Sequence, residues 1–362
     1  MKPLLKVEDL KVWFPLRKGF IDVLFGKMEY VRAVDGVSFS MGERETFCLV
    51  GESGCGKTTT ARAVMMLVDR SDIKGGRALF RPHEEVLSEA AKIQPDAVVD
   101  GEYIDLYKTR GYSNKIVRRE IQMIFQDPFG SINPRMSVYD VVEEPLIVHG
   151  IGPREERIEI VAKALEAVKL VPPEEFMVRY PHQLSGGQRQ RVSIARALTL
   201  NPRLLLADEP VSMLDVSIRA EVLNVLEELK KTRGMSIMFI THDIALARYI
   251  CDRIAVMYLG KIVEMADADT IIEKPLHPYT RALINAVPDV VPENRLRFRE
   301  VPIKGEVPSA VRIPTGCRFR PRCVAYDLNP WVQEHCAREE PGLVELEKGH
   351  YVACWVPIKK RS

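Results

Sequence analysis

The sequence lacks a long hydrophobic run: no stretch approaches about 18 consecutive apolar residues, the length that a membrane-spanning helix needs. Residues 1–10 carry acidic side chains and no apolar core, so they do not resemble a secretory signal peptide. The 52 Lys and Arg side chains nearly balance the 50 Asp and Glu side chains, which leaves a formal charge of +2. Without a broad basic field, nucleic-acid binding is not expected. We therefore expect a cytosolic protein.

Cysteine is unevenly distributed along the 362 residues. Cys48, Cys55 and Cys251 are scattered, whereas the remaining four of the seven cysteines lie close together near the C-terminus. A cytosolic setting disfavours disulfides, so the clustered thiols call for another explanation. With 46% hydrophobic residues, the chain can build one large domain and an accessory one. The clustered cysteines are Cys317, Cys323, Cys336 and Cys354.

The most informative stretch is G-E-S-G-C-G-K-T at residues 51–58. Residues 46–50 before it have the pattern of a buried strand, and residues 59–68 after it have that of a helix. Strand, glycine loop and helix N-terminus together form a phosphate cradle, in which Lys57 meets the terminal phosphates and Thr58 offers a hydroxyl to Mg²⁺. A tight turn that binds nothing is the alternative. The expected ATP contacts are Gly51, Glu52, Ser53, Gly54, Cys55, Gly56, Lys57, Thr58 and Thr59.

Polar residues follow three further buried strands, which we expect at residues 121–125, 204–207 and 236–240. In a parallel sheet the carboxyl ends of the strands face the ligand crevice. Asp208 is suited to Mg²⁺ and Glu209 can polarise an attacking water. A lone histidine after a strand is usually structural, but a third polar strand end favours a phosphate-sensing role. The residues at these ends are Gln126, Asp208, Glu209 and His242.

A second anion site is expected at L-S-G-G-Q, residues 184–188, where Ser185 has the position of a helix N-cap. Free N–H groups at a helix N-terminus attract phosphate. An ordinary cap is the alternative, but it needs neither two glycines nor a glutamine. The candidate nucleotide contacts here are Ser185, Gly186, Gly187 and Gln188.

An aromatic side chain ahead of the phosphate loop can stack on an adenine ring. We expect residues 4–14 to form an edge strand, and Phe14 is the first choice, with Trp13 and Tyr30 or simple core packing as alternatives. The guanine-reading pattern Asn-Lys-x-Asp is absent, which favours adenine. Residues 82–99 read as a polar surface insertion with a short helical pattern.

Together these motifs resemble the nucleotide-binding subunit of an ATP-binding-cassette (ABC) transporter. The resemblance implies that two subunits sandwich ATP, so that the signature and D-loop of one chain complete the site of the other. It also implies that Thr58, Gln126 and Asp208 hold Mg²⁺, that Gln126, Glu209 and His242 are catalytic, and that Asp215 contacts ATP. The matching segments are residues 51–58 (Walker A), Gln126 (Q-loop), 184–188 (signature), 204–209 (Walker B), 212–215 (D-loop) and His242 (switch).

A narrower resemblance, to the oligopeptide/dipeptide importers, rests on residues 125–138, on residues 274–288 and on the cysteine tail from Gly316. It implies an ATPase that powers solute import from the cytoplasmic face of the membrane, as a peripheral subunit. The implied partners are a second ATPase subunit, two membrane permease subunits and an external solute-binding protein. The transported substrate, whether peptide, oligosaccharide or metal chelate, is not readable from this chain.

The expected fold is α/β: a P-loop ABC nucleotide-binding domain with a RecA-like core, an antiparallel β subdomain and a helical subdomain, followed by a small cysteine-rich extension. We place the nucleotide-binding domain at residues 1–265, with its helical subdomain at about 131–200. A helical linker with a His-Pro-Tyr motif follows at 266–300, and the cysteine-rich region at 301–362. A soluble cassette ATPase of translation or DNA repair is the alternative function, but such proteins usually carry two cassettes or long coiled coils.

The four clustered cysteines are expected to ligate an iron–sulfur cluster, 4Fe–4S in preference to zinc. Structural zinc sites favour close cysteine pairs, and this tail has none. A mixed zinc site with His335 or His350, a disulfide and unliganded thiols remain as alternatives. Some importers of this subfamily carry a cluster in the tail, which supports the same assignment. We expect a structural or redox-sensing role, because the tail is distant in sequence from the phosphate loop.

Overall fold

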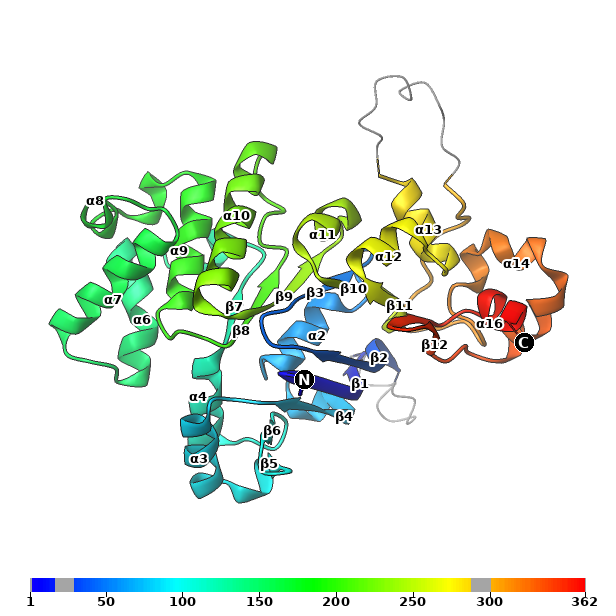
Figure 1. Cartoon of the computed structure of the whole chain (residues 1–362), viewed down its shortest axis with the longest axis horizontal. Coiled ribbons are helices and arrows are strands. Elements are labelled where there is room, and N and C mark those ends of the chain that lie inside the picture. Colours follow the sequence, from blue (N-terminus) through cyan, green and yellow to red (C-terminus); the bar gives the residue numbers. More distant parts are fainter. Residues whose placement is uncertain (1, 17–28, 288–300, 362) are drawn as a thin grey trace.

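The computed structural model describes residues 2–16, 29–287 and 301–361, without the side chains of residues 128–129 and 359–361. Part of the expected linker, residues 288–300, therefore lies outside the described residues. Within the described parts, no helix combines the length and the apolar character needed to cross a membrane. Figure 1 shows a central sheet with a helical layer at one end and the cysteine-bearing C-terminal region at the other.

An eight-stranded sheet runs through the centre of the molecule in the order β12-β13-β11-β10-β3-β9-β8-β7 (Figure 1). From β10 to β7 all neighbours are parallel, and their residues are almost all buried, as expected for strands covered on both faces. At the other end of this parallel group, β10 and β11 form an antiparallel hairpin through Leu259-Gly260. The strands are β3 (Thr46–Val50), β7 (Ile121–Ile124), β8 (Leu204–Asp208), β9 (Ser236–Thr241), β10 (Arg253–Tyr258), β11 (Lys261–Asp267), β12 (Val344–Glu347) and β13 (His350–Val352).

A second, five-stranded antiparallel sheet has the order β2-β1-β4-β6-β5, and helix α2 (Lys57–Val64) packs against it. The prediction of an edge strand at residues 4–14 is wrong, because β1 pairs with β2 on one side and β4 on the other. Alternating hydrophobicity reports a buried face and not the number of neighbours. The strands are β1 (Leu5–Pro15), β2 (Tyr30–Met41), β4 (Ile73–Phe80), β5 (Val98–Val99) and β6 (Tyr103–Asp105).

The helical layer packs on the side of β7 and contains helices within residues 131–200, the segment expected to form a helical subdomain. Helix α6 begins with a capping box between Ser137 and Asp140 and ends at Gly150 in the left-handed conformation. The insertion at residues 82–99 contains the expected helix, α3. The helices are α3 (Glu84–Ile93), α4 (Gly111–Glu120), α5 (Pro128–Ser131), α6 (Val138–His149), α7 (Arg154–Ala167), α8 (Pro173–Met177), α9 (Gly186–Leu198), α10 (Val216–Arg233), α11 (Ile244–Ile250), α12 (Ala268–Glu273), α13 (Pro278–Asn285), α14 (Val324–Leu328), α15 (Gln333–Arg338) and α16 (Trp355–Arg361).

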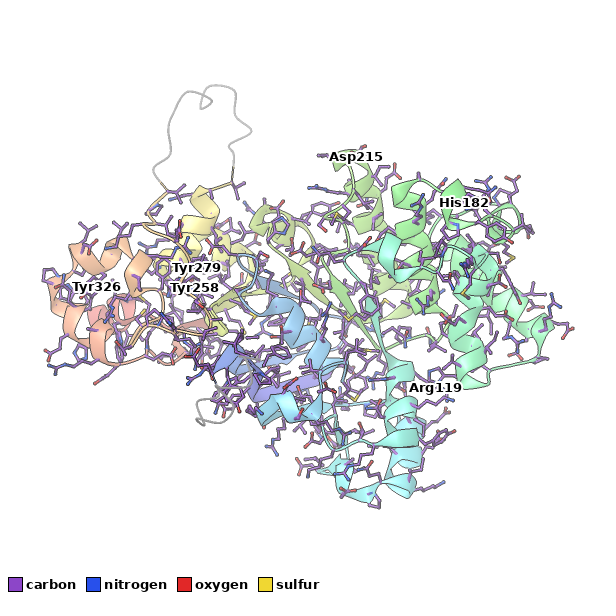
Figure 2. The ribbon with its side chains drawn as sticks, turned by 180° about the vertical axis from the view of Figure 1, so that it is seen from behind. Arg119, His182, Asp215, Tyr258, Tyr279 and Tyr326 are labelled. Atoms are coloured by element: carbon purple, nitrogen blue, oxygen red, sulfur yellow. A yellow bond between two sulfur atoms is a disulfide. The ribbon has the colours of Figure 1, made fainter. Side chains whose placement is uncertain are left out.

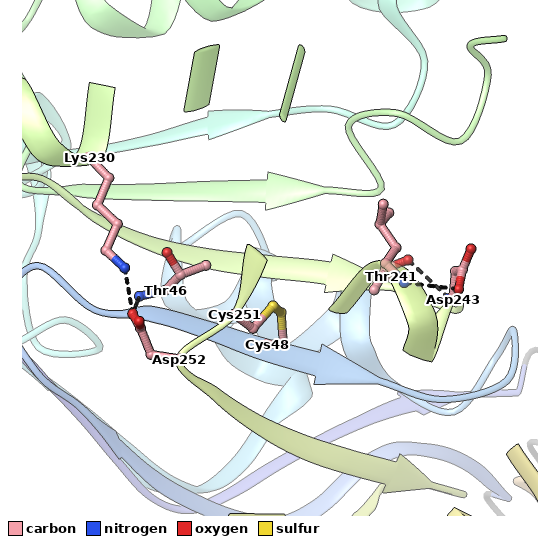
Figure 3. Close-up of a disulfide and its surroundings, with 8 residues drawn as sticks. Thr46, Cys48, Lys230, Thr241, Asp243, Cys251 and Asp252 are labelled. Carbon is pink, nitrogen blue, oxygen red and sulfur yellow. Dashed lines mark hydrogen bonds and ion pairs between the residues drawn. A yellow bond between two sulfur atoms is a disulfide. The ribbon is translucent and has the colours of Figure 1, made fainter. Parts of the chain in front are cut away.

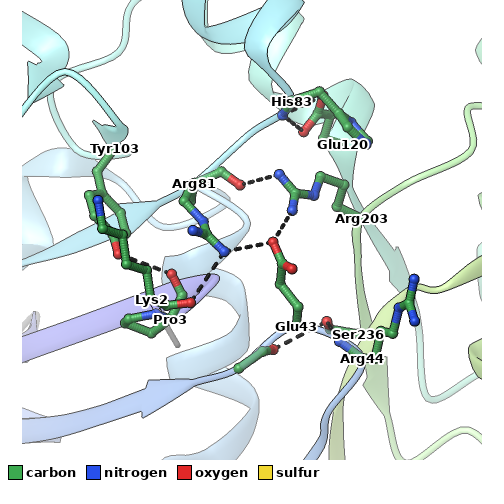
Figure 4. Close-up of polar contacts among 11 residues, drawn as sticks. Lys2, Pro3, Glu43, Arg44, Arg81, His83, Tyr103, Glu120, Arg203 and Ser236 are labelled. Atoms are coloured by element: carbon green, nitrogen blue, oxygen red, sulfur yellow. Dashed lines mark hydrogen bonds and ion pairs between the residues drawn. The ribbon is translucent and has the colours of Figure 1, made fainter.

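A charged network joins the two sheets at the amino ends of the central strands (Figure 4). The Glu43 carboxylate, just before β3, accepts hydrogen bonds from Arg81 and from Arg203, which precedes β8. Arg203 also donates to the main-chain carbonyl of Arg81 at 3.0 Å. Because this network lies at the amino ends, it holds the sheets together without occupying the carboxyl ends.

A disulfide joins Cys48 of β3 to Cys251, the residue that ends α11 (Figure 3). Their Cα atoms are 5.9 Å apart, and both residues are buried in the core. The sequence did not indicate this pair, because an expected cytosolic setting disfavours disulfides. Two scattered cysteines meet because β3 and α11 pack together, a contact that sequence spacing does not reveal.

The C-terminal region continues the central sheet, because β13 pairs antiparallel with β11. At this junction the carboxylate of Glu264 is 0% exposed. It accepts the backbone N–H groups of Leu276 at 2.7 Å and His277 at 2.9 Å, and it lies 2.8 Å from Nε2 of His350. One buried carboxylate thus ties together β11, the start of α13 and β13.

Replacing Glu264 tests this junction. In Glu264→Ala three buried polar groups lose their partner, so we expect the free energy of unfolding to fall by about 3 kcal/mol. Urea denaturation followed by circular dichroism measures the change. Glu347→Ala, an exposed position on β12, is the control and should change stability by less than about 0.5 kcal/mol. Equal stability of the two variants would contradict this account.

Candidate active site

The phosphate loop leaves β3 and enters α2 as the sequence predicts, although α2 ends at Val64, before the expected Val68. Gly56 precedes the helix with φ of 109°, and a Cβ there would lie 2.2 Å from the carbonyl oxygen of Ala33. A Cβ on Gly51 would lie 2.2 Å from the carbonyl oxygen of Met257. Neighbouring backbone thus excludes side chains at both positions, and the loop can close tightly.

Lys57 extends across the inside of this loop. Its side chain is buried, with only 4% of the residue exposed, and Nζ donates to the carbonyl oxygens of Gly51 at 2.7 Å and Glu52 at 3.0 Å. The ammonium group is therefore held at the loop, which leads into the N-terminus of α2, where the first N–H groups have no partner within the helix. A cation next to a helix N-terminus is a strong arrangement for binding phosphate.

Thr58 and Asp208 meet on the other side of the loop. The Thr58 hydroxyl donates to Oδ1 of Asp208 at 2.9 Å. Burial raises the pKa of Asp208, and this hydrogen bond lowers it in part. A hydroxyl and a carboxylate are the oxygen ligands that Mg²⁺ prefers, and the ion is normally completed by water and substrate phosphate. The pair therefore fits a magnesium ion.

Three polar strand ends converge beside the loop. Glu209 Oε2 accepts from Nε2 of Gln126 at 3.0 Å, and Glu209 Oε1 is 3.2 Å from Nδ1 of His242. Glu209 has a left-handed φ of 44°, a conformation rare for a residue with a side chain and typical of functional sites. A cavity of about 40 Å³ beside Glu209 and His242 can hold a water. The carboxylate thus lies between the Gln126 amide and the His242 ring, next to this cavity.

The other loop residues face different surroundings. Ser53 and Gly54 are exposed, and Thr59 is half-buried on the first turn of α2. Cys55 instead points into the core, and burial raises the pKa of its thiol. Its backbone alone can therefore face a phosphate.

The three candidates for stacking on adenine have different surroundings. Phe14 is half-buried at the edge of the same core cluster that contains Cys55. Trp13 is held elsewhere, since its indole N–H donates to Asp35 at 3.0 Å and its ring packs against Tyr30. Phe14 thus remains the first choice.

The signature residues lie in the helical layer, apart from α2 (Figure 1). Ser185 and Gln188 form a capping box at the start of α9, and a Cβ on Gly187 would lie 2.4 Å from Cγ2 of Ile218. Asp215 precedes α10 and is exposed, and in Figure 2 it lies well apart from Tyr258 and Tyr279. The structure therefore brings together the loop and the strand ends but leaves the signature and Asp215 apart from them, with Ser185 and Asp215 exposed.

The four clustered cysteines line one small cavity of about 10 Å³. Burial raises the pKa of Cys317 to about 12 and of Cys336 to about 11, and it also raises the pKa values of Cys323 and Cys354. Among the described residues no three His, Cys, Asp or Glu side chains are arranged to hold one metal ion. The thiols converge, but the metal centre expected from the sequence is not shown.

Two residues that contact the loop are not indicated by any sequence motif of the nucleotide site. Tyr279, from the His-Pro-Tyr motif, accepts the backbone N–H of Glu52, and Arg322 pairs with the Glu52 side chain. Both are far from the loop in sequence, and no spacing rule connects them. The only sequence signals were the motif itself and the arginines beside the cysteines.

Comparisons with known proteins agree with this geometry. A family model described as ABC transporter matches residues 34–212, and one described as oligopeptide/dipeptide transporter, C-terminal region, matches residues 263–326. The chain is 42% identical over 354 residues to the putative oligopeptide transport ATP-binding protein YkfD of Bacillus subtilis (strain 168), covering 97% of this chain and 95% of that protein. It is 41% identical over 351 residues to the oligopeptide transport ATP-binding protein AppF of the same strain, covering 97% and 96%.

A similar solved structure is the dimeric post-hydrolysis state of the ATP-binding cassette MJ0796 bound to ADP and Pi. It has a TM-score of 0.56 and 27% identity, and the match covers 73% of this chain and 98% of that chain. The shared fold confirms the expected α/β cassette.

Gly56→Ala tests the loop geometry. Because the added Cβ would collide with the carbonyl of Ala33 and φ is positive, the loop must move, and we expect the Kd for ADP to rise at least tenfold. Fluorescent-nucleotide titration measures this. Gly101→Ala is the control, since that glycine also has a positive φ but has open space around it. An unchanged Kd in a folded Gly56→Ala protein would contradict the assignment.

Proposed function

Because this chain belongs to the ABC transporter family, among the oligopeptide transport ATP-binding proteins, we propose that it hydrolyses ATP at the strand-end site to power peptide import. The observation that carries the proposal is the convergence of Gln126, Glu209 and His242 beside the Lys57 loop. The family and the relatives support this function rather than that of a soluble cassette in translation or DNA repair.

The residues of the site divide the work of the proposed reaction. The loop N–H groups and Lys57 bind the β- and γ-phosphates. Thr58 and Asp208, together with Gln126, would hold Mg²⁺, which when bound would neutralise phosphate charge. Glu209 accepts a proton from the attacking water, and Gln126 and His242 orient that water and the γ-phosphate. The water oxygen bonds to the γ-phosphorus, the bond to the β-phosphate oxygen breaks, and ADP and phosphate leave.

The signature completes the site of a second ATPase subunit. Ser185, Gly186, Gly187 and Gln188 offer a helix N-terminus on the surface, and Asp215 is exposed nearby on α10. The similar cassette bound to ADP and Pi is dimeric. We therefore place ATP between the loop of one subunit and the signature of the other, with Phe14 stacking on adenine.

The membrane-facing partners are permease subunits, as expected for oligopeptide importers, and the chain acts peripherally at the cytoplasmic face of the membrane. The C-terminal family match and the relatives support this placement. An external solute-binding protein and a complement of two permease subunits complete the proposed importer. In this chain, residues 131–200 form the helical subdomain, which follows Gln126 in sequence. A movement of Gln126 on ATP binding or hydrolysis can therefore shift this subdomain against the permeases.

For the thiol cavity we retain a 4Fe–4S cluster as the proposed occupant. A mononuclear zinc site would bring the sulfurs within about 4 Å of each other, since each lies about 2.3 Å from the ion. In a four-iron cluster each thiolate binds its own iron, so four thiols that line one cavity can each supply one ligand. The cluster requires the thiols to lose the protons that burial favours, and it requires the cavity to widen.

Glu209→Gln is the direct test of catalysis. The amide keeps the shape but cannot accept a proton, so we expect hydrolysis to fall by about 10²–10³-fold while ATP still binds. Lys57→Ala should instead weaken binding itself. Glu228→Gln, a surface change on α10, is the control and should leave both unchanged. Loss of nucleotide binding in Glu209→Gln would refute the assigned role.

Anaerobic purification tests the thiol cavity. We expect a brown protein with iron and acid-labile sulfide, and loss of both in Cys336→Ser. Cys55→Ser lies outside the cavity and should retain the colour. A colourless protein with one equivalent of zinc would overturn the iron–sulfur assignment without affecting the ATPase.

A further inference from the structure

A contact between the C-terminal region and the phosphate loop is not used by the proposed mechanism. Arg322 directly precedes Cys323, and its guanidinium pairs with Glu52 through two bonds: Nη1 lies 2.8 Å from Oε2 and Nη2 lies 3.1 Å from Oε1. The Arg322 side chain is 9% exposed and that of Glu52 is 30% exposed. A partly buried bidentate pair fixes orientation as well as distance.

A second contact holds the main chain of the same loop residue. The backbone N–H of Glu52 donates to the hydroxyl of Tyr279 at 2.9 Å. Tyr279 is fully buried on the first turn of α13, with its ring centroid 4.8 Å from that of Tyr258 and 5.4 Å from that of Phe319. Figure 2 shows Tyr258 and Tyr279 side by side where the central sheet meets the C-terminal region. The hydroxyl therefore has a fixed position.

These contacts act on the part of the loop that Lys57 uses. The carbonyl of Glu52 accepts from Lys57 Nζ at 3.0 Å, and it also accepts the N–H of Cys55 at 3.3 Å. A rotation of the main chain at Glu52 would thus move the carbonyl that holds Lys57 Nζ and would break the turn closed by the N–H of Cys55. We propose that Arg322 and Tyr279 are positioning residues that hold the phosphate loop in its nucleotide-accepting form, an inference that rests on the proposed role of residues 51–58.

Docking of the C-terminal region does not by itself require this clamp. Arg318 already anchors that region elsewhere, with Nη2 2.5 Å from Oδ2 of Asp35 and Nη1 2.7 Å from the carbonyl oxygen of Leu259. Strand β13 adds a second anchor through β11. The pairing of Arg322 with the loop is therefore additional, and its effect is expected on nucleotide affinity.

Linkage supplies a readout that a merely structural contact would not give. If Glu52 couples the loop to the C-terminal region, docking of that region raises nucleotide affinity by some factor. Nucleotide binding must then favour docking of the region by the same factor. Hydrogen exchange of residues 317–323 should slow when ADP is added. The response should disappear when the Glu52 carboxylate is removed.

The experiment uses the full chain and measures the Kd for ADP and the KM and kcat for ATP. Glu52→Gln and Arg322→Ala should each raise Kd and KM about tenfold with kcat within twofold, and the double variant should show no further loss, because the two residues form one pair. Arg322→Lys should recover part of the affinity, and Tyr279→Phe should raise Kd about threefold. Arg338→Ala is the control, an exposed arginine of the same region, and should match the unmodified chain.

Unchanged Kd and ADP-dependent hydrogen exchange in folded Glu52→Gln would overturn the proposal. If Arg322→Ala does not fold, Glu52→Gln and Tyr279→Phe decide the outcome, because both leave every tail arginine in place. Failure of the unmodified chain to bind ADP would instead overturn the role of residues 51–58. Binding by the unmodified chain with equal binding by these variants would reject the clamp alone.

Discussion

The parallel pairing of β3, β9, β8 and β7 is the constraint on which the site depends. In this register Val50 lies opposite Thr241, and Asp208 lies opposite Ile240, so the strands end at one edge. The loop and the polar residues that follow these strands therefore meet because their strands are neighbours in the sheet. The left-handed backbone of Glu209 costs about 1–3 kcal/mol, and its N–H bond to the Ile240 carbonyl at 2.9 Å helps to hold it.

The C-terminal region is attached to the nucleotide-binding domain through three contacts. Strand β13 extends the sheet, Arg318 holds the Asp35 carboxylate, and Arg322 reaches the phosphate loop itself. The residue that contacts the loop, Arg322, is adjacent in the chain to Cys323, which lines the thiol cavity. The cysteines, remote in sequence from the loop, are thus near it in the fold.

The sequence predicts those parts of the structure that depend on local pattern. Buried strands, the glycine loop and the polar strand ends each have a short-range signal, and Asp208, Glu209 and His242 lie where that signal indicates. Long-range contacts have no such signal: β1 lies inside its sheet, Cys48 meets Cys251 across 203 positions, and Arg322 meets Glu52 across 270 positions. The clustering of four cysteines in sequence predicts that their thiols lie close together. It does not identify a ligand, because that depends on the positions of the sulfur atoms in the fold.

In the proposed importer, one edge of this sheet forms half of an ATP site that a second subunit completes. The most direct measurement is a structure of Glu209→Gln with Mg²⁺ and ATP. We expect two facing subunits, with the γ-phosphate between Lys57 of one and Ser185 of the other, and Gln126 and His242 beside it. ATP bound by a single chain, with the signature left in solvent or the nucleotide away from residues 51–58, would contradict it.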